Sequence, residues 1–378
     1  MAASKAAAPP RVRRRARFHE LEVAEVRPLT ADSVEVSFTV PPELHDEYDY
    51  LAGQYVALRK TIDGHELRRS YSICRPSRFD STGGGRISVG IKRDIGGRFS
   101  TWANSELRAG DRIDVMSPQG TFTTGLPDLD GAHIVGIAAG SGITPLMSVA
   151  HTVLETSDTA RFTLVYTNRS TLDVMFLEEL ADLKDRFPAR LALQHVLSRE
   201  QRAAPLLSGR IDAEKLGTML DVLIRPEAVT EWFLCGPFEL VQLCRDTLED
   251  RGVPATSIRF ELFTTDADRI EGDIGRPVVV RPDEETIRID FTLDGLSGTV
   301  ESPVSANESI LNAALRVRPD VPFACAGGVC GTCRARLIEG KVQMTENYAL
   351  EPEELERGYV LTCQSHPKTP VVVVDYDV

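Results

Sequence analysis

Four cysteines in the last part of the chain carry the clearest chemistry. Cys325, Cys330 and Cys333 follow the pattern C-x4-C-x2-C, and Cys363 comes later in the sequence. Disulfide frameworks are typical of small secreted domains with an even number of cysteines, whereas this chain has 378 residues and 7 cysteines. The four thiols therefore indicate a metal centre rather than disulfide bonds.

The order of these cysteines separates two kinds of metal centre. Three ligands from one tight loop and a fourth from a later segment is the arrangement of a plant-type [2Fe-2S] cluster. Gly327, Gly328 and Gly331 lie between the cysteines, where a backbone wrapped round a cluster needs positive φ angles. The alternative is a tetrahedral zinc site, although such sites usually show two C-x2-C pairs and here there is one. We predict a [2Fe-2S] cluster held by all four cysteines.

A segment upstream, RRSYSIC, has side chains suited to a flavin dinucleotide. Arg69, Tyr71 and Ser72 fall on an expected strand. Arginine can bind the pyrophosphate, tyrosine can pack along the ribityl chain and ring, and serine can contact the polar edge of the isoalloxazine. A strand that bears Arg and Tyr is nevertheless common, so this segment alone does not establish a flavin site.

The later segment GGRFSTWANSEL is expected to form a glycine turn followed by a helix. Gly97, Phe99 and Ser100 stand at its start, after Gly96, where free backbone amides and the helix dipole favour a phosphate. An ordinary surface helix after a turn is the alternative.

HIVGIAAGSGITPLMSVAHTVLE predicts a buried strand, a glycine turn and a helix. Gly140 and Gly142 would let the backbone approach a pyrophosphate, and Thr144 and Pro145 are the expected N-cap and first helical residue. Pro145 stands where the G-x-G-x-x-G fingerprint has its third glycine. The pattern is therefore that of a nucleotide-binding βα unit with one departure.

The end of RFTLVYTNRS bears on the choice of coenzyme. After the second strand of a dinucleotide-binding fold, an acidic residue binds the ribose 2′-hydroxyl of NAD, or an arginine accommodates the 2′-phosphate of NADP. Here the strand ends in Asn168 and Arg169, which favours NADPH over NADH. Asp173 would weaken this prediction if the loop folds back, and the alternative is an exposed arginine that caps a surface loop.

Taken in order, these segments resemble the ferredoxin–NADP reductase superfamily. RSYS, GGRFS and SPQGTF match its flavin-binding half, and GSGITP and the C-G-P of EWFLCGPFEL match its pyridine-nucleotide half. The resemblance implies that Cys235, Gly236 and Pro237 lie beside the nicotinamide, and that Ser72 and Cys235 serve catalysis. A cysteine at a strand end is otherwise more often a small buried hydrophobe.

The last part of the chain resembles a plant-type ferredoxin domain. TIRIDFTLDG and LSGTVES match its strand pair, ESILNAALRV its helix, and YVLTCQ and VVVVDY its closing strands. The resemblance implies a multidomain protein: an antiparallel β-barrel FAD domain, an α/β nucleotide-binding domain and an α+β ferredoxin domain of the β-grasp type. The expected bounds are 17–124 for the FAD domain, 126–263 for the NAD(P) domain, 264–285 for a linker and 286–378 for the [2Fe-2S] ferredoxin domain.

Three such domains imply one electron route. A nicotinamide nucleotide gives up a hydride, which carries two electrons, and FAD can pass these singly to a cluster. The domain order resembles the reductases of bacterial multicomponent oxygenases. Among the matching stretches, VCGTC and TENYALEPEEL followed by GYVLTCQ are more specific and are most similar to the reductase subunits of ring-1,2-phenylacetyl-CoA epoxidases. This implies electron flow from NADPH through FAD and the cluster to a di-iron oxygenase subunit. The alternatives are a reductase of a Rieske-type oxygenase, such as a steroid hydroxylase, and a stand-alone electron carrier or redox sensor.

Composition argues against two other classes of partner. The formal net charge of −13 is unfavourable for binding nucleic acid or an anionic membrane surface. No apolar run is long enough to span a bilayer, and the first twenty residues lack the apolar stretch of a secretory signal. We therefore expect a cytoplasmic protein. The histidines are scattered and no G-x-S-x-G motif occurs, so we predict neither a histidine metal site nor hydrolytic chemistry.

Overall fold

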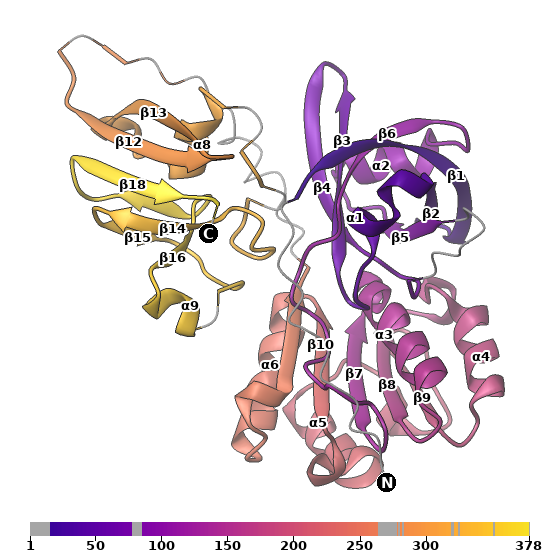
Figure 1. The fold of residues 1–378 in the computed structure, drawn as a ribbon. Helices are drawn as coiled ribbons and strands as arrows, with labels where there is room; N and C mark the ends of the chain where they lie inside the picture. The colour runs from indigo at the N-terminus through magenta and orange to yellow at the C-terminus, as the bar shows by residue number, and fades with distance from the viewer. Residues whose placement is uncertain are drawn as a thin grey trace, which may run out of the picture. The chain divides into compact units, whose positions relative to one another are not determined.

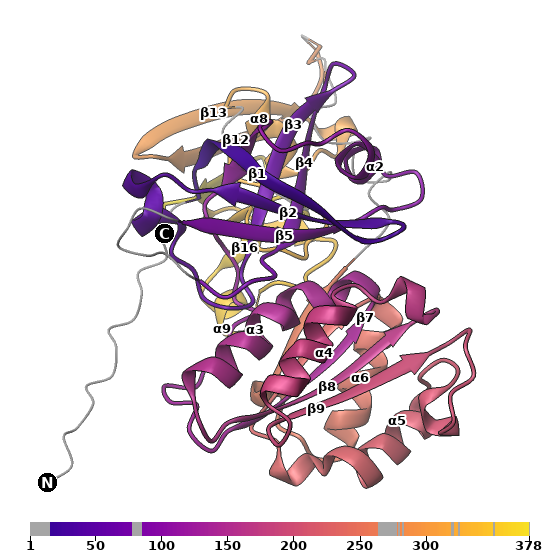
Figure 2. The same ribbon diagram turned by 90° about the vertical axis from the view of Figure 1, so that its right-hand side faces the viewer.

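A computed structural model describes residues 16–77, 85–263, 278, 280–281, 283–318, 321–323, 326–350 and 352–377. The chain divides into two compact units: the first takes in most of the chain before residue 265, and the second takes in residues 265–378. Of the expected linker 264–285, only residues 278, 280–281 and 283–285 are described, and these form neither helix nor strand. Figures 1 and 2 show the elements of both units in two views.

The first unit begins with a six-stranded sheet in the order β4-β3-β6-β1-β2-β5. Its strands are β1 (Phe18–Thr30), β2 (Ser33–Thr39), β3 (Tyr55–Ile62), β4 (His65–Ser72), β5 (Arg86–Lys92) and β6 (Arg112–Met116). Just after β4, Ile73 forms an antiparallel bridge to Val89 on β5, so the two ends of this order meet and the sheet closes into a barrel. Apolar side chains from all six strands fill the interior, because successive side chains of a strand point to opposite faces.

Two short helices cover the barrel. Helix α1 (His45–Tyr48) buries Tyr48, whose hydroxyl donates a hydrogen bond of 2.6 Å to the carbonyl oxygen of Val115. Helix α2 (Arg98–Ser105) buries Phe99 and Ala103 against the barrel interior.

The rest of the first unit is a five-stranded parallel sheet in the order β11-β10-β7-β8-β9. Its strands are β7 (His133–Ala139), β8 (Arg161–Asn168), β9 (Leu191–Leu197), β10 (Glu231–Gly236) and β11 (Ile258–Leu262). Its α-helices are α3 (Ile143–Thr156), α4 (Leu177–Arg186), α5 (Ala213–Met219) and α6 (Phe238–Asp250). Helices α3 and α4 cover one face of the sheet, and α5 and α6 cover the other (Figure 2).

The nearly continuous burial of β7, β8 and β10 follows from this cover on both faces. The strand order reverses between β7 and β10, so the carboxyl ends of these two strands define the crevice where such folds bind nucleotides.

Short helical turns connect many of these elements. They are η1 (Pro42–Leu44), η2 (Gly140–Gly142), η3 (Thr171–Asp173), η4 (Pro205–Leu207), the π-helix η5 (Leu220–Ile224), η6 (Pro226–Ala228), η7 (Ala255–Ser257) and, in the second unit, η8 (Val304–Ala306).

The second unit is a mixed sheet in the order β13-β12-β18-β14-β16, with a separate two-stranded sheet β15-β17. The strands are β12 (Thr286–Leu293), β13 (Leu296–Pro303), β14 (Arg334–Glu339), β15 (Val342–Met344), β16 (Tyr359–Leu361), β17 (Ser365–Pro367) and β18 (Val371–Asp375). The helices are α8 (Ile310–Leu315) and α9 (Pro352–Glu356). The side chain of Ser309 caps α8 by accepting a hydrogen bond from the amide of Asn312, and the helix buries its apolar face against the sheet.

The central strands β12 and β18 of this unit run parallel, and the other pairs of its sheets run antiparallel. One helix across such a sheet is the β-grasp arrangement. The predicted fold class of three differently built domains is therefore confirmed. Among the residues that the structure describes, no helix is both long and apolar enough to cross a membrane.

Candidate functional site

The two predicted catalytic residues meet at a third side chain, Glu261. Ser72 ends β4 of the barrel, is buried, and donates a hydrogen bond of 2.8 Å from its hydroxyl to Oε2 of Glu261. Cys235 lies on β10, and its Sγ is 4.0 Å from the same oxygen. The parallel register of β10 and β11 pairs Cys235 directly with Glu261, which explains why one carboxyl group reaches both. Sequence reasoning missed Glu261.

The environment of Cys235 keeps its thiol protonated. The side chain is 1% exposed, and burial, followed by the charge of Glu261, raises its pKa well above the usual value. A thiol in this state is a poor nucleophile. It therefore offers a small polarizable surface beside the site rather than covalent chemistry.

Glycine brings the backbones of β10 and the turn after β7 together. A Cβ on Gly142 would lie 2.2 Å from the carbonyl oxygen of Cys235 and 3.0 Å from the amide nitrogen of Gly236. Gly236 itself has a φ of 154°, and a Cβ there would lie 3.0 Å from the side chain of Ala139. Pro237, the third residue of the predicted C-G-P segment, follows as the N-cap of α6. Larger residues would therefore separate the two strand ends that form the crevice.

The flavin-side residues Arg69 and Tyr71 lie on β4, both partly exposed. The ring of Tyr71 is 5.8 Å from that of Phe99, which is in turn 5.6 Å from the ring of Trp102. Phe99 is only 1% exposed and belongs to the barrel core. Its side chain thus supports Tyr71 from behind, and it is Tyr71 that has surface available for a ligand.

The start of α2 has the features of a phosphate site. Gly97 is its N-cap, and no side chain caps the first amides of the helix, so they remain available to an anion. The buried hydroxyl of Ser100 accepts a hydrogen bond of 3.1 Å from the amide of Asp94. A Cβ on Gly97 would lie 2.5 Å from that hydroxyl, so this turn requires glycine. The residues present therefore fit the pyrophosphate of FAD.

The start of α3 differs from the prediction. The helix begins at Ile143 with Gly142 as its N-cap, so Thr144 is not the N-cap and Pro145 is not the first helical residue. The reason is that the turn Gly140–Gly142 is itself a 3-10 helix that continues directly into α3. Thr144 is buried, and its hydroxyl donates a hydrogen bond of 3.0 Å to the carbonyl oxygen of Ser141.

The carboxyl end of β8 carries a buried side-chain amide that has no hydrogen-bond partner among the described residues. The hydroxyl of Tyr166 donates a hydrogen bond of 2.9 Å to the carbonyl oxygen of Gly140, which ties β8 to the turn. Asn168 is 7% exposed, and its Nδ2 has no hydrogen-bond partner among the described residues. An unpaired buried donor is costly, so this amide fits a polar group of a bound nucleotide.

The loop after β8 folds back and brings Asp173 beside Arg169. Asp173 accepts hydrogen bonds from the amide of Ser170 at 3.1 Å and from its hydroxyl at 2.6 Å. The same carboxyl group is paired with the guanidinium of Arg169, which is half exposed and also lies 3.5 Å from Asp32 of the barrel. The arginine on which the NADPH prediction rests is therefore held by two acidic side chains, which weakens that prediction.

The cluster region brings two of the four predicted ligands together. Cys333 and Cys363 flank the paired strands β14 and β16 and are buried. The carbonyl oxygen of Cys333 accepts hydrogen bonds from both the amide and the hydroxyl of Thr362, at 3.1 and 2.8 Å. Cys330 is partly exposed on the loop, its thiol 3.1 Å from the hydroxyl of Thr332. The fourth predicted ligand, Cys325, lies outside the described residues.

The loop before β14 has the backbone expected around a cluster. Ala326, Gly328 and Gly331 have φ angles of 52°, 77° and 68°. The Gln364 side chain donates a hydrogen bond of 2.7 Å to the carbonyl oxygen of Ala326, which fixes the loop against the segment that carries Cys363. In the described part of the chain, no three His, Cys, Asp or Glu side chains are grouped closely enough to hold a metal. The loop conformation and the cysteine side chains, none of which forms a disulfide in the described part of the chain, nevertheless fit a [2Fe-2S] cluster.

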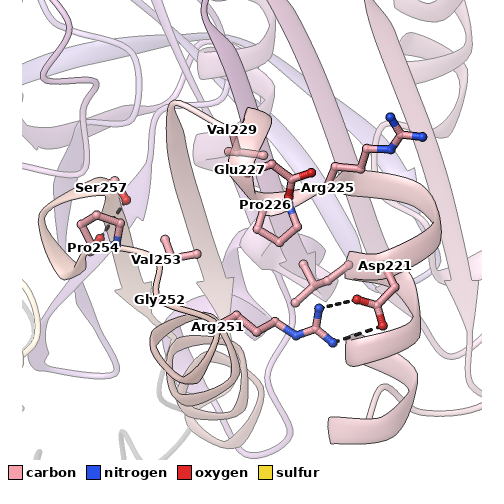
Figure 3. A pocket seen from close by; sticks show the side chains of 11 residues that line it. Asp221, Arg225, Pro226, Glu227, Val229, Arg251, Gly252, Val253, Pro254 and Ser257 are labelled. Carbon is pink, nitrogen blue, oxygen red and sulfur yellow. Dashed lines mark hydrogen bonds and ion pairs between the residues drawn. The ribbon is translucent and has the colours of Figure 1, made fainter.

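A separate cavity of about 600 Å³ opens in the nucleotide-binding domain (Figure 3). It is lined by Leu220, Asp221, Arg225, Pro226, Glu227, Val229, Arg251, Gly252, Val253, Pro254 and Ser257. Arg251 and Asp221 form a double ion pair across it, at 2.5 and 3.3 Å. The cavity lies beside the amino ends of β10 and β11, whereas nucleotides bind at the carboxyl ends, and none of the predicted site residues lines it.

Comparison with known proteins agrees with this geometry. The chain matches the family model of the oxidoreductase FAD-binding domain over residues 20–124, that of the oxidoreductase NAD-binding domain over 137–246, and that of the 2Fe-2S iron-sulfur cluster binding domain over 291–368. It is 42% identical to one of the subunits of the 1,2-phenylacetyl-CoA epoxidase of Escherichia coli, over 95% of this chain and 98% of the relative. It is 34% identical to the ferredoxin reductase component of the 3-ketosteroid-9-alpha-monooxygenase of Mycolicibacterium smegmatis, over 95% and 97% of the two chains.

A solved structure supports the fold. Phthalate dioxygenase reductase, described as modular for electron transfer from pyridine nucleotides to [2Fe-2S], superposes with a TM-score of 0.56 at 23% identity, over 95% of this chain and 98% of that one. The predicted superfamily and its three cofactors, FAD, a nicotinamide nucleotide and a [2Fe-2S] cluster, are confirmed. The chain belongs to the family of iron–sulfur flavoprotein reductases that join an FAD-binding, a NAD-binding and a C-terminal [2Fe-2S] domain in one polypeptide.

Proposed function

We propose that this protein is the reductase component of a multicomponent oxygenase and passes electrons from NADPH through FAD and the [2Fe-2S] cluster to a di-iron oxygenase subunit that epoxidises the ring of phenylacetyl-CoA. The observation that carries this proposal is the 42% identity to a component of a phenylacetyl-CoA epoxidase along 98% of that relative. FAD supplies the conversion of a two-electron hydride into single electrons. The protein's residues bind and align the cofactors.

The proposed domains are 17–124 for FAD, 126–263 for NAD(P), and 286–378 for the cluster, joined by 264–285. In the first, Arg69, Tyr71 and Ser72 would hold the flavin and the start of α2 would hold its pyrophosphate. In the second, Gly140, Gly142 and the end of β10 would hold the nicotinamide nucleotide. These roles are supported by the meeting of Ser72 and Cys235 at one carboxyl group, one residue from each domain.

We also propose NADPH as the preferred donor. Arg169 and Arg199 follow the ends of the adjacent parallel strands β8 and β9, and the amide of Arg199 donates a hydrogen bond of 2.7 Å to the carbonyl oxygen of Arg169. Two guanidinium groups on neighbouring strand ends suit a 2′-phosphate. The phosphate would have to displace Asp173 from Arg169, so binding exchanges one ion pair for another.

Reconstitution with candidate oxygenases tests the proposed acceptor. The purified reductase is mixed with a di-iron phenylacetyl-CoA epoxidase and its substrate, and NADPH consumption is measured together with epoxide formation. We expect the two to be coupled nearly one to one. NADPH oxidation without product in the presence of an oxygenase that turns over with its own reductase would contradict the proposed partner.

A second candidate is the reductase of a Rieske-type steroid oxygenase. It is favoured by the 34% identity to a 3-ketosteroid-9-alpha-monooxygenase reductase component, which also spans 95% of this chain. The same assay with a Rieske steroid hydroxylase and a 3-ketosteroid separates the candidates, because only the correct oxygenase gives product at a rate set by the reductase concentration. Failure with both oxygenases would favour a stand-alone electron carrier.

A further inference from the structure

A buried carboxylate lies at the side of the barrel that faces the nucleotide-binding domain. Glu35 on β2 is 5% exposed and is bound by two arginines. Arg75 donates to both of its carboxylate oxygens, at 2.5 and 2.7 Å, and Arg27 donates to Oε2 at 2.5 Å. Burial by itself raises the pKa of Glu35, but the hydrogen bonds and charges of Arg75 and Arg27 outweigh it and hold the pKa below its usual value. Glu35 is therefore a stable anion that fixes both arginines.

A fourth charged residue joins this network from the other domain. Glu179, in the first turn of α4, is hydrogen bonded to Nη2 of Arg27 through Oε1, and the same oxygen lies 3.4 Å from Nη2 of Arg75. Two arginines and two glutamates thus form a neutral network across the junction of barrel and nucleotide-binding domain. Glu35 by itself binds both arginines within the barrel, and Glu179 supplies the second negative charge that makes the network neutral.

Other contacts hold the same junction together. The hydroxyl of Ser148, on α3, donates a hydrogen bond of 2.7 Å to the carbonyl oxygen of Arg75. Strand β5 comes so close to α3 that a Cβ on Gly90 would lie 2.6 Å from Cγ2 of Thr144. The segment around Arg75 is therefore tied to the nucleotide-binding domain through its backbone as well as its side chain.

Arg75, which contacts the nucleotide-binding domain, lies three residues after Ser72 at the end of β4. Ser72 is held by Glu261 on β11, and Arg75 is held by Ser148 and Glu179 on α3 and α4. The segment between them thus spans the junction and is fixed at both ends. A displacement of about 1 Å between reacting groups can cost roughly a hundredfold in rate, so small movements of this segment matter.

We propose that Glu179 is a positioning residue for hydride transfer: through Arg75 and Arg27 it holds the flavin-side Ser72 at a fixed separation from the nicotinamide-side Cys235. Glu179 does not touch the reacting groups, and it acts by keeping the two domains in register. This inference rests on the proposed transfer of hydride from the nicotinamide nucleotide to FAD.

The test compares Glu179→Gln with Glu178→Gln in the holoenzyme. Glu178 is the preceding residue of the same helix turn, is exposed, and so provides the same change of charge without the network. Flavin reduction is followed in anaerobic stopped-flow experiments at saturating NADPH and, separately, NADH. For Glu179→Gln we expect the limiting rate of flavin reduction to fall about tenfold with the nucleotide Kd within about twofold of wild type. Glu178→Gln should match wild type in both.

A readout independent of turnover accompanies the kinetics. Hydrogen–deuterium exchange of the protein without nucleotide should quicken in peptides that span Ser72–Arg75 and the start of α3 in Glu179→Gln but not in Glu178→Gln, with FAD and iron content unchanged. Ser148→Ala, which removes the backbone tie, should act in the same direction.

Three results bear on the inference in different ways. An unchanged limiting rate and unchanged exchange in Glu179→Gln would overturn it. A rise in Kd with an unchanged limiting rate would also overturn it, because it would assign Glu179 to nucleotide binding. Absence of flavin reduction by either nucleotide in the wild-type protein would instead contradict the proposed function, so the two failures are distinguishable.

Discussion

At the scale of single residues, three cysteines outside the cluster region are almost completely buried. Cys74, Cys235 and Cys244 are at most 1% exposed. Burial raises the pKa of Cys244 to about 12, and burial together with nearby carboxylates raises the pKa of the other two well above the usual value. Because only the thiolate reacts readily, these three residues should be chemically silent in the folded protein.

We therefore predict that iodoacetamide at pH 8 leaves Cys74, Cys235 and Cys244 unmodified in the native holoenzyme. All three should be alkylated after denaturation, since an unfolded thiol has a pKa of about 8.5. Peptide mapping by mass spectrometry assigns each site. Rapid native alkylation of Cys235 would show that its thiol is more accessible and more acidic than the structure indicates.

Arg169 supports a prediction on coenzyme choice. A hydrogen bond to a charged group is worth roughly 1.5–3 kcal/mol, so Arg169→Ala should lower kcat/KM for NADPH by roughly ten- to a hundredfold and barely change the value for NADH. Steady-state kinetics with both nucleotides measure this. Equal losses with both would assign Arg169 to the fold or to a site shared by the two coenzymes.

The sequence indicated the candidate site residues one at a time but not how their charges pair. The spacing of Ser72 and Cys235 within family motifs identified them, and the structure brings them to one carboxyl group. Glu261 has no motif around it, and only the register of two parallel strands places it beside Cys235. The pairing of Asp173 with Arg169 depends on the path of a loop that residue types alone do not determine.

At the scale of elements, the turn between β7 and α3 requires glycine at position 142, because a side chain there would not fit. Gly142 packs against the backbone of β10, and backbone atoms cannot move aside as the end of a flexible side chain can. This contact sets the distance between the two strand ends of the nucleotide crevice.

We predict that Gly142→Ala destabilises the protein by roughly 3 kcal/mol, because a Cβ would lie 2.2 Å from the carbonyl oxygen of Cys235. It should also weaken nucleotide binding. Gly131→Ala is the matched control, because Gly131 has a φ of 75° but open space around its Cβ position, and should cost about 1 kcal/mol from backbone strain alone. The denaturation midpoints of both variants, compared with wild type, measure these losses of stability. Because Gly142 has a φ of −60° and no backbone strain of this kind, an unchanged stability of Gly142→Ala would show that the contact with β10 contributes nothing.

The same turn shows why an element's existence was easier to predict than its first residue. Apolar periodicity and two glycines indicated the strand, turn and helix correctly. Thr144 before Pro145 has the residue types of an N-cap, but the 3-10 turn runs into the helix without a break, and the hydroxyl of Thr144 donates backward to Ser141 instead. Residue types alone did not show that the turn Gly140–Gly142 continues directly into the helix.

At the scale of the whole molecule, sequence motifs in a fixed order predicted three domains, because each domain carries its own local pattern. The contacts between domains show no such sequence pattern. Arg27 and Glu179 are 152 residues apart, and neither stands in a recognisable motif. The network that they form with Glu35 depends on the three-dimensional packing of the barrel against the nucleotide-binding domain.

The order of domains leads to a prediction on the order of electron flow. On the proposed route, hydride transfer to FAD needs only the first unit, whereas delivery to an outside acceptor needs the cluster of the second. Changing any one of the four cluster cysteines to Ala should therefore abolish reduction of the oxygenase and leave flavin reduction by the nicotinamide nucleotide within about twofold of wild type. Cys363→Ala is the most informative choice, because it removes the predicted ligand outside the loop and leaves the loop sequence intact. Flavin bleaching near 450 nm measures the first step, and oxygenase reduction measures the second.

Cys244→Ser, a buried cysteine outside the cluster region, controls for the loss of a thiol and should retain both steps. If Cys363→Ala lost both steps while remaining folded with its FAD, the flavin would not precede the cluster in the route, and the assigned sequence of transfers would be wrong.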